Sequence, residues 1–137
     1  MTAPVVSRWI ALAPYLLSLL RIVAALMFMQ AGTVKLFGWP VSMPGGGSPP
    51  LMSQICIGAM LEFVGGALLL VGLFTRPVAF ILSGEMAVAY FQFHYPRGFW
   101  PVVNEGQPAV LYCFIWLYMS ARGAGPWSLD AMLRKSG

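Results

Sequence analysis

The chain has 137 residues, of which 59% are hydrophobic and 9% are charged, and its formal net charge is +4. Soluble domains carry about 25% charged residues, so this composition excludes an ordinary soluble domain and predicts an integral membrane protein. The length has room for about four helical spans in a single domain over residues 1–137. The basic residues stand apart at segment ends, which excludes a nucleic-acid-binding surface.

The first predicted span covers residues 15–37. Before it, a short stretch around Arg8 and Trp9 is expected to lie at the membrane interface as a turn or two of helix. Arg21 inside the span and the lack of a small-residue cleavage motif argue against a secretory signal peptide. Residues 37–50 contain three consecutive glycines and four prolines, so they are predicted to form a loop.

The second and third spans are predicted at residues 51–74 and 77–93. The Thr75-Arg76-Pro77 connection between them is short, so the two spans should form an antiparallel hairpin. An aromatic and polar loop follows, and the fourth span is expected at about residues 104–121. A short surface helix is predicted at 129–135, with Ser128 as its N-cap. It is expected to bury three apolar residues, Leu129, Met132 and Leu133.

The predicted fold is therefore all-α: an integral membrane four-helix bundle with short interfacial helices at both termini. Four spans place both termini on the same side of the membrane. That side collects most of the basic residues outside the spans, namely Arg8, Arg76, Arg122, Arg134 and Lys135. Because cytoplasmic loops carry an excess of Lys and Arg, both termini are expected in the cytoplasm.

Two carboxylates, Glu62 and Glu85, lie near the middles of the second and third spans. A charge in hydrocarbon costs at least about 2.5 kcal/mol, so both should face the bundle interior and find partners. Arg21 and Lys35 share one face of the first span. With a rise of about 1.5 Å per residue, Arg21 and Glu85 lie about 9 and 12 Å from the cytoplasmic end and should pair. Structural ion pairs and a ligand or proton-coupled site both remain open interpretations.

The thiols of Cys56 and Cys113 are expected at a similar depth, since the second and fourth spans run in the same direction. They could form a redox pair if their Cα atoms lie within about 7 Å, and otherwise act as small hydrophobic residues. His94 is the single histidine, and zinc or haem needs further ligands, so no metal site is predicted.

Seven short motifs occur in a fixed order along the chain: Leu20-Arg21, Ala31-Gly32, Lys35-Leu36-Phe37, Glu62 with Gly65-Gly66, Gly72-Leu73-Phe74-Thr75-Arg76, Met86-Ala87-Val88-Ala89 with His94, and Gly125-Pro126-Trp127-Ser128-Leu129-Asp130. In this order the chain resembles the DoxX family over nearly its whole length. The resemblance implies a four-helix protein of a bacterial inner membrane, similar to the small subunit of thiosulfate:quinone oxidoreductase. Many relatives have an Asn-Gly-Gly turn before an acidic residue, whereas this chain reads Asn104-Glu105-Gly106-Gln107-Pro108.

The leading functional expectation is a redox-associated membrane subunit that binds a quinone headgroup under the outer loops. The candidate binding residues are Lys35, Gln92, His94, Trp39 and Trp100. The expected intramembrane charge network is the Arg21–Glu85 pair, with Glu62 as a proton relay. No flavin, haem or iron-sulfur motif is present, so electrons would need quinone, a partner redox subunit or the cysteine pair.

Two alternatives differ in class. The chain could be a non-enzymatic scaffold that binds another membrane protein or itself as a homo-oligomer. It could instead be a transporter of a small molecule or lipid, which would place Glu62 in a water-accessible cavity. No catalytic residue is assigned from the sequence.

Overall fold

The computed structural model describes residues 2–136, and these residues form helices joined by turns and loops, without strands. In chain order the elements are α1 (Thr2–Ala11), α2 (Ala13–Phe37), α3 (Gln54–Val71), α4 (Thr75–Ala89), the π-helix η1 (Tyr90–His94), the 3₁₀ helix η2 (Tyr95–Arg97), α5 (Pro101–Asn104), α6 (Gln107–Arg122) and α7 (Leu129–Ser136). The all-α prediction is confirmed over this range.

Two helices of the described chain, α2 with 25 residues and α3 with 18, are long and apolar enough to cross a membrane. The helix α4 has 15 residues and α6 has 16. α4 continues without interruption into η1, because Tyr90 keeps a right-handed helical conformation and its N–H bonds to the carbonyl oxygens of Met86 and Ala87. Within η1, the N–H of Tyr95 bonds to the carbonyl oxygen of Tyr90, the spacing of a π-helix.

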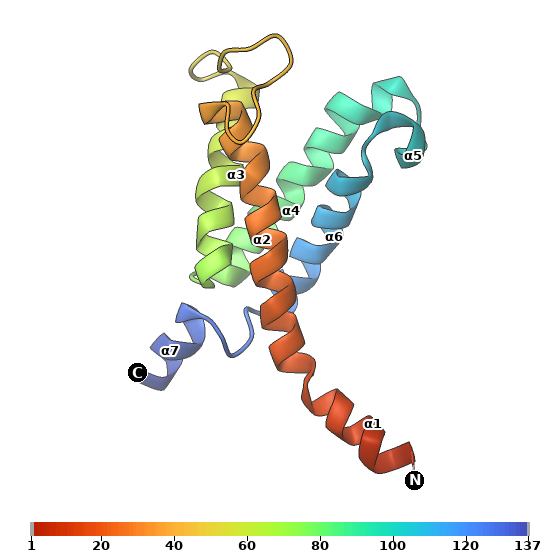
Figure 1. Cartoon of the computed structure of the whole chain (residues 1–137), viewed down its shortest axis with the longest axis vertical. Helices are drawn as coiled ribbons and strands as arrows, with labels where there is room; N and C mark the ends of the chain where they lie inside the picture. The colour runs from red at the N-terminus through yellow and green to blue at the C-terminus, as the bar shows by residue number, and fades with distance from the viewer. Residues whose placement is uncertain (1, 137) are drawn as a thin grey trace.

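The long helices pack as two pairs, α2 with α3 and α4 with α6, and α3 and α4 form the predicted antiparallel hairpin between the pairs. Figure 1 shows that the pairs diverge toward the end that carries α5 and the long loop after α2. Both chain ends lie at the opposite end, near α1 and α7. The helix pairs are therefore farther apart at one end than at the other.

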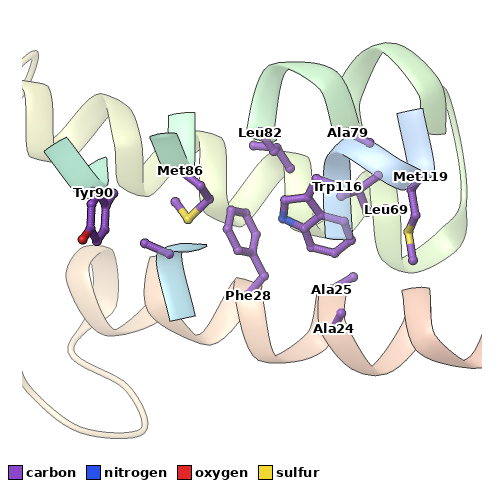
Figure 2. Packing of buried hydrophobic residues seen from close by; sticks show 11 residues of the cluster. Ala24, Ala25, Phe28, Leu69, Ala79, Leu82, Met86, Tyr90, Trp116 and Met119 are labelled. Carbon is purple, nitrogen blue, oxygen red and sulfur yellow. The ribbon is translucent and has the colours of Figure 1, made fainter. Parts of the chain in front are cut away.

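The buried core lies where the four long helices meet (Figure 2). Trp116 of α6 is fully buried, and its ring contacts Phe28 of α2 edge to face, with centroids 5.6 Å apart. Leu69 of α3 and Leu82 of α4 complete the contact between the pairs. One apolar cluster therefore holds both pairs together.

The glycine Gly32 sets the distance between α2 and α3. A Cβ atom at this position would lie 2.9 Å from the backbone oxygen of Ala59 and 2.9 Å from the backbone nitrogen of Phe63. No side chain fits into that space without moving a backbone, so the two helices are in near-direct backbone contact here.

Some predicted boundaries are wrong by a few residues. α3 starts at Gln54 rather than residue 51, because Ser53 is its N-cap and accepts a hydrogen bond from the backbone N–H of Cys56 at 3.2 Å. The hairpin connection is residues 72–74, and Thr75-Arg76-Pro77 instead forms the first turn of α4, a position that tolerates proline. α6 starts at Gln107 rather than 104, because Glu105 has a positive φ that ends α5.

The terminal helices exist as predicted, and Ser128 caps α7 by accepting a hydrogen bond from the N–H of Ala131 at 3.1 Å. The rest of the protein does not bury the three apolar residues that α7 is expected to bury, so their burial in a membrane surface stays a prediction. Leu129, Met132 and Leu133 are exposed on the protein surface, and Ala131 is the buried residue.

Candidate functional site: a cavity between the helix pairs

A cavity of about 400 Å³ lies between the two helix pairs, and residues of α2, α3, α4, η1 and α6 line it. Most of its wall is apolar and includes Phe28, Met86 and Ala109. Its polar lining residues are Lys35, Gln54, Glu62, Glu85, His94 and Tyr112. A largely apolar cavity with a few convergent polar groups is the usual form of a small-molecule site.

An ion pair between Lys35 of α2 and Glu62 of α3 stands at the wall of this cavity. The Lys35 ammonium donates to both carboxylate oxygens of Glu62 at 2.9 Å. Glu62 is 4% exposed, whereas the Lys35 side chain keeps 31% of its surface accessible. The pair therefore joins the two helices and leaves one flank of the ammonium open to a ligand.

Glu85 faces the same pair from α4 and interacts electrostatically with both Glu62 and Lys35. Its Oε2 atom is buried and has no hydrogen-bond partner among residues 2–136. Gly58 of α3 leaves space for this carboxylate, since a Cβ atom there would lie 3.3 Å from Oε1. Two carboxylates thus meet one ammonium, and a proton or a hydrogen-bond donor on a ligand would offset the excess negative charge.

His94 is the last residue of the π-helix η1, an element that occurs often at functional sites. Its Nδ1 atom lies 3.0 Å from the carbonyl oxygen of Asn104 and 3.3 Å from Nη2 of Arg97. The contact to the carbonyl requires a proton on Nδ1, whereas the longer contact to Arg97, which can only donate, requires a lone pair there. With the proton on Nδ1, the lone pair is on Nε2. The imidazole can then accept a hydrogen bond from a ligand hydroxyl.

Residues 16–95 match the profile of one protein family, DoxX, and this stretch is more than half of the chain. The chain belongs to the DoxX family. The matched region runs from α2 through η1, so it contains Lys35, Glu62, Glu85 and His94 of the cavity. Together with the apolar helices α2 and α3, the family marks the chain as a membrane protein.

A protein of Haemophilus influenzae (strain KW20 / Rd), described only as an uncharacterized protein, is 46% identical to this DoxX chain over 120 residues. The alignment covers 85% of this chain and 90% of the relative. No solved structure matches the chain.

The DoxX chain brings two of its five predicted ligand-binding residues, Lys35 and His94, to the cavity. Gln92 is exposed and accepts a hydrogen bond from Gln54, which does line the cavity. Trp39 is 67% exposed and Trp100 is 65% exposed, and neither lines the cavity. Gln92 misses the cavity because η1 turns this residue away from the face that carries Glu85 and His94.

The predicted pairing of Arg21 with Glu85 is wrong. Arg21 is fully buried, and its guanidinium donates to the backbone carbonyl oxygens of Ala124 and Trp127, the latter at 2.6 Å. The chain after α6 folds back against α2, and its carbonyl groups accept these hydrogen bonds. The depths predicted from residue positions along straight spans did not take this returning segment into account. The charge network of the cavity is therefore Lys35, Glu62 and Glu85.

The family motif at residues 125–130 closes the end of the bundle near the termini. The carboxylate of Asp130 accepts hydrogen bonds from the backbone N–H groups of Phe74 at 2.8 Å and Thr75 at 2.9 Å. The N–H of Asp130 donates to the carbonyl oxygen of Gly72 at 2.9 Å. The motif thus ties the returning chain to the α3–α4 connection, which is a structural role.

Both cysteines are free thiols in this structure, so no disulfide joins Cys56 to Cys113. The sulfur of Cys113 lies 3.6 Å from the hydroxyl oxygen of Ser83, and neither cysteine lines the cavity. Among the described residues, no three His, Cys, Asp or Glu side chains gather at one place as a metal site would need.

Asn104 organises the turn next to the cavity, a role not predicted from the sequence, where Asn104 is noted only as part of the turn before the fourth span. Asn104 is fully buried, donates to the carbonyl oxygen of Gly98 at 2.7 Å and accepts from the N–H of Gly106 at 2.8 Å. Its own carbonyl oxygen is the partner of His94. The sequence feature that could have predicted this role is an asparagine two residues before a glycine, because the asparagine side chain can then bond to the backbone and hold a turn.

Proposed function

We propose that this DoxX chain is a membrane-embedded, redox-associated subunit that binds a quinone-like molecule in the cavity between its helix pairs. The observation that carries the proposal is the convergence of Lys35, Glu85 and His94 on one apolar cavity. A volume of about 400 Å³ is in the range of small-molecule sites.

The cavity chemistry suits an aromatic ring that carries two oxygens. The apolar wall with Phe28, Met86 and Ala109 would pack against the ring. The Lys35 ammonium would donate to a carbonyl oxygen of the oxidised molecule. The unpartnered oxygen of Glu85 would accept a hydrogen bond from a hydroxyl of the reduced molecule.

The redox part of the proposal is supported by the family resemblance to a quinone-linked oxidoreductase subunit. The chain would act with a partner redox subunit that supplies or accepts electrons, while its own residues hold the quinone and exchange protons. Lys35 and Glu85 are suited to that exchange because both line the cavity.

The proposed membrane topology has four spans: α2, α3, the continuous helix over residues 75–94, and α6. The third of these is close to the ~20 residues that a span needs. α6 is shorter, with 16 residues, and the side chain of Asn104 accepts a hydrogen bond from the N–H of Gly106 just before its first turn. We place both termini in the cytoplasm of a bacterium, on the basis of the basic residues at that end.

The test is a titration of the purified protein with a short-chain ubiquinone, followed by tryptophan fluorescence and by melting temperature. Wild type should show saturable quenching and a higher melting temperature. The double variant Lys35→Ala/Glu62→Gln, which removes both charges of the ion pair together, should bind about tenfold more weakly, as expected for loss of a hydrogen bond from a charged group. Arg8→Ala, which removes an exposed cation of α1 outside the cavity, is the matched control and should behave as wild type.

The proposal fails if quinone changes neither the fluorescence nor the melting temperature of the wild type. It also fails if the double variant and wild type give the same binding curve.

A second candidate function is proton-coupled transport of a small molecule, and it is favoured by Glu62 and Glu85 lining the same cavity. In proteoliposomes, a transporter would acidify or alkalinise the lumen when its substrate is added, and Glu85→Gln would abolish that response. A quinone-binding subunit would give no such flux by itself.

A further inference from the structure

We propose that the end of the bundle near both termini holds the phosphate group of an anionic phospholipid in a second cleft, distinct from the cavity between the helix pairs. This cleft has a volume of about 390 Å³ and lies between the start of α2, the chain after α6, and α7. The proposal does not depend on the function proposed for the cavity.

Three basic side chains line this cleft: Arg122 at the end of α6, and Arg134 and Lys135 in the last turn of α7. The ion pairs found within residues 2–136 are Lys35–Glu62 and Arg97–Glu105. None of the three basic groups therefore has a carboxylate partner within 4 Å in that range. Three cations around one hollow, of which only Arg134 interacts with a carboxylate, that of Asp130, form a strong site for a phosphodiester.

The neighbouring cleft, of about 380 Å³, extends the same basic surface. It is lined by Arg76 of α4 and again by Arg134, with Asp130 as its acidic residue. The Asp130 carboxylate is already engaged by the backbone N–H groups of Phe74 and Thr75. The two clefts together therefore contain four cations and one carboxylate, that of Asp130, which is already hydrogen-bonded. The excess positive charge at this end of the molecule attracts anions.

Aromatic residues place the cleft at the depth of lipid headgroups. The rings of Tyr15 on α2 and Trp127 in the returning chain contact each other with centroids 5.5 Å apart, and both are exposed. Tyr and Trp are enriched at this level of the bilayer. Pro14, next to Tyr15, lines the cleft, and Trp127 directly follows the lining residues 122–126, so a phosphate in the cleft would sit at the polar–apolar boundary.

The exposed apolar side of α7 indicates a lipid rather than a free anion. Leu129 and Leu133 are exposed beside the basic residues of the same helix. A soluble phosphate would use the cations alone, whereas a phospholipid would also cover these side chains with its acyl chains. Basic clefts next to membrane spans commonly accept anionic headgroups in this way.

The experiment uses the full chain purified in a mild detergent, with bound lipid measured by native mass spectrometry and the melting temperature as a second readout. The probes are phosphatidylglycerol, phosphatidylcholine and inorganic phosphate. Wild type should retain phosphatidylglycerol about tenfold more tightly than phosphatidylcholine. The double variant Arg122→Gln/Lys135→Gln keeps Arg134 near Asp130 and should lose most of this preference.

Arg97→Gln, at the opposite end of the bundle, is the matched control and should keep the wild-type preference. If the double variant is unstable without lipid, the preference of wild type is measured again at high salt, where it should fall because exposed charges are screened. The proposal is overturned by equal retention of the two lipids, by an unchanged preference in a folded double variant, or by no effect of salt. Full competition by inorganic phosphate would also overturn it, since the site would then bind a free anion.

Discussion

At the residue scale, the two cations within α2, the half-buried Lys35 and the buried Arg21, are neutralised by different chemistry. Lys35 carries a compact ammonium that meets the carboxylate of Glu62. Arg21 carries a planar guanidinium with five donors, and backbone carbonyls of the returning chain accept from it. A carboxylate is needed only in the first case, which leaves Glu85 available to a ligand in the cavity.

Asp130 gives a residue-scale prediction on pH. Burial raises the pKa of Asp130, but hydrogen bonds from Thr75 and Phe74 and the charge of Arg134 outweigh burial and hold this pKa below its ordinary value. Its contribution to stability is therefore complete above about pH 3.9, the unfolded value, and is lost as pH falls through the lower folded pKa.

Asp130→Asn should lower the stability of the detergent-solubilised protein at neutral pH by about 1 kcal/mol, as loss of a helix cap does. The difference from wild type should shrink as the pH is lowered below 4, because the wild-type carboxyl is then protonated too. Melting curves of wild type and Asp130→Asn across this pH range check the prediction. A difference that stays constant down to the lowest pH would contradict the assigned role of the charge.

At the element scale, glycines at helix contacts determine how closely the helices approach. Gly32 brings the backbones of α2 and α3 together one helical turn from Lys35, so the ion pair with Glu62 depends on this approach. Gly65 accommodates Leu82 in the same way between α3 and α4. The cavity geometry therefore rests on residues that carry no functional group.

Gly32→Ala should destabilise the fold by about 1 to 3 kcal/mol, the range for overpacked sites, because its Cβ would meet backbone atoms of Ala59 and Phe63. Gly84→Ala is the matched control, since a Cβ atom there meets nothing within 4 Å. It should be neutral or stabilising by up to about 1 kcal/mol, from helix propensity. Thermal or denaturant unfolding of the two variants in one detergent checks the difference, and equal effects would refute the close contact.

At the scale of the whole molecule, the two helix pairs and the returning chain give the bundle two unlike ends. The pairs diverge at the end with α5 and the long loop after α2 (Figure 1). At the other end, the chain after α6 bonds to α2 and to the start of α4. A ligand of the cavity would accordingly enter from the end where the pairs diverge or sideways from the bilayer.

The proposed four-span topology predicts which positions a membrane-impermeant maleimide labels in intact cells. In a background with both native cysteines replaced by alanine, Gly46→Cys in the long loop should react. Lys135→Cys in α7 should react only after the membrane is permeabilised. Labelling of both positions in intact cells would contradict an even number of spans with cytoplasmic termini.

The sequence was sufficient for the properties that depend on solvent and on local chain geometry. Composition indicated a membrane protein, periodicity placed Arg21 and Lys35 on the inward face of α2, and Ser128 was identified as a cap. The hairpin of α3 and α4 followed from the length of their connection. These properties need no knowledge of distant contacts, because each depends on neighbours within a few residues or on transfer from water to lipid.

The partners of the buried charges were decided only by the tertiary structure. Arg21 was predicted to pair with Glu85 because the two residues have similar depths along straight spans. That estimate could not include the chain that returns after α6 and binds Arg21. It also could not include the relative position of α2 and α3 that lets Lys35 reach Glu62. It also could not show that η1 directs Gln92 outward and His94 into the cavity. Charge pairing depends on distances of a few ångströms between residues far apart in sequence, and only packing determines those distances.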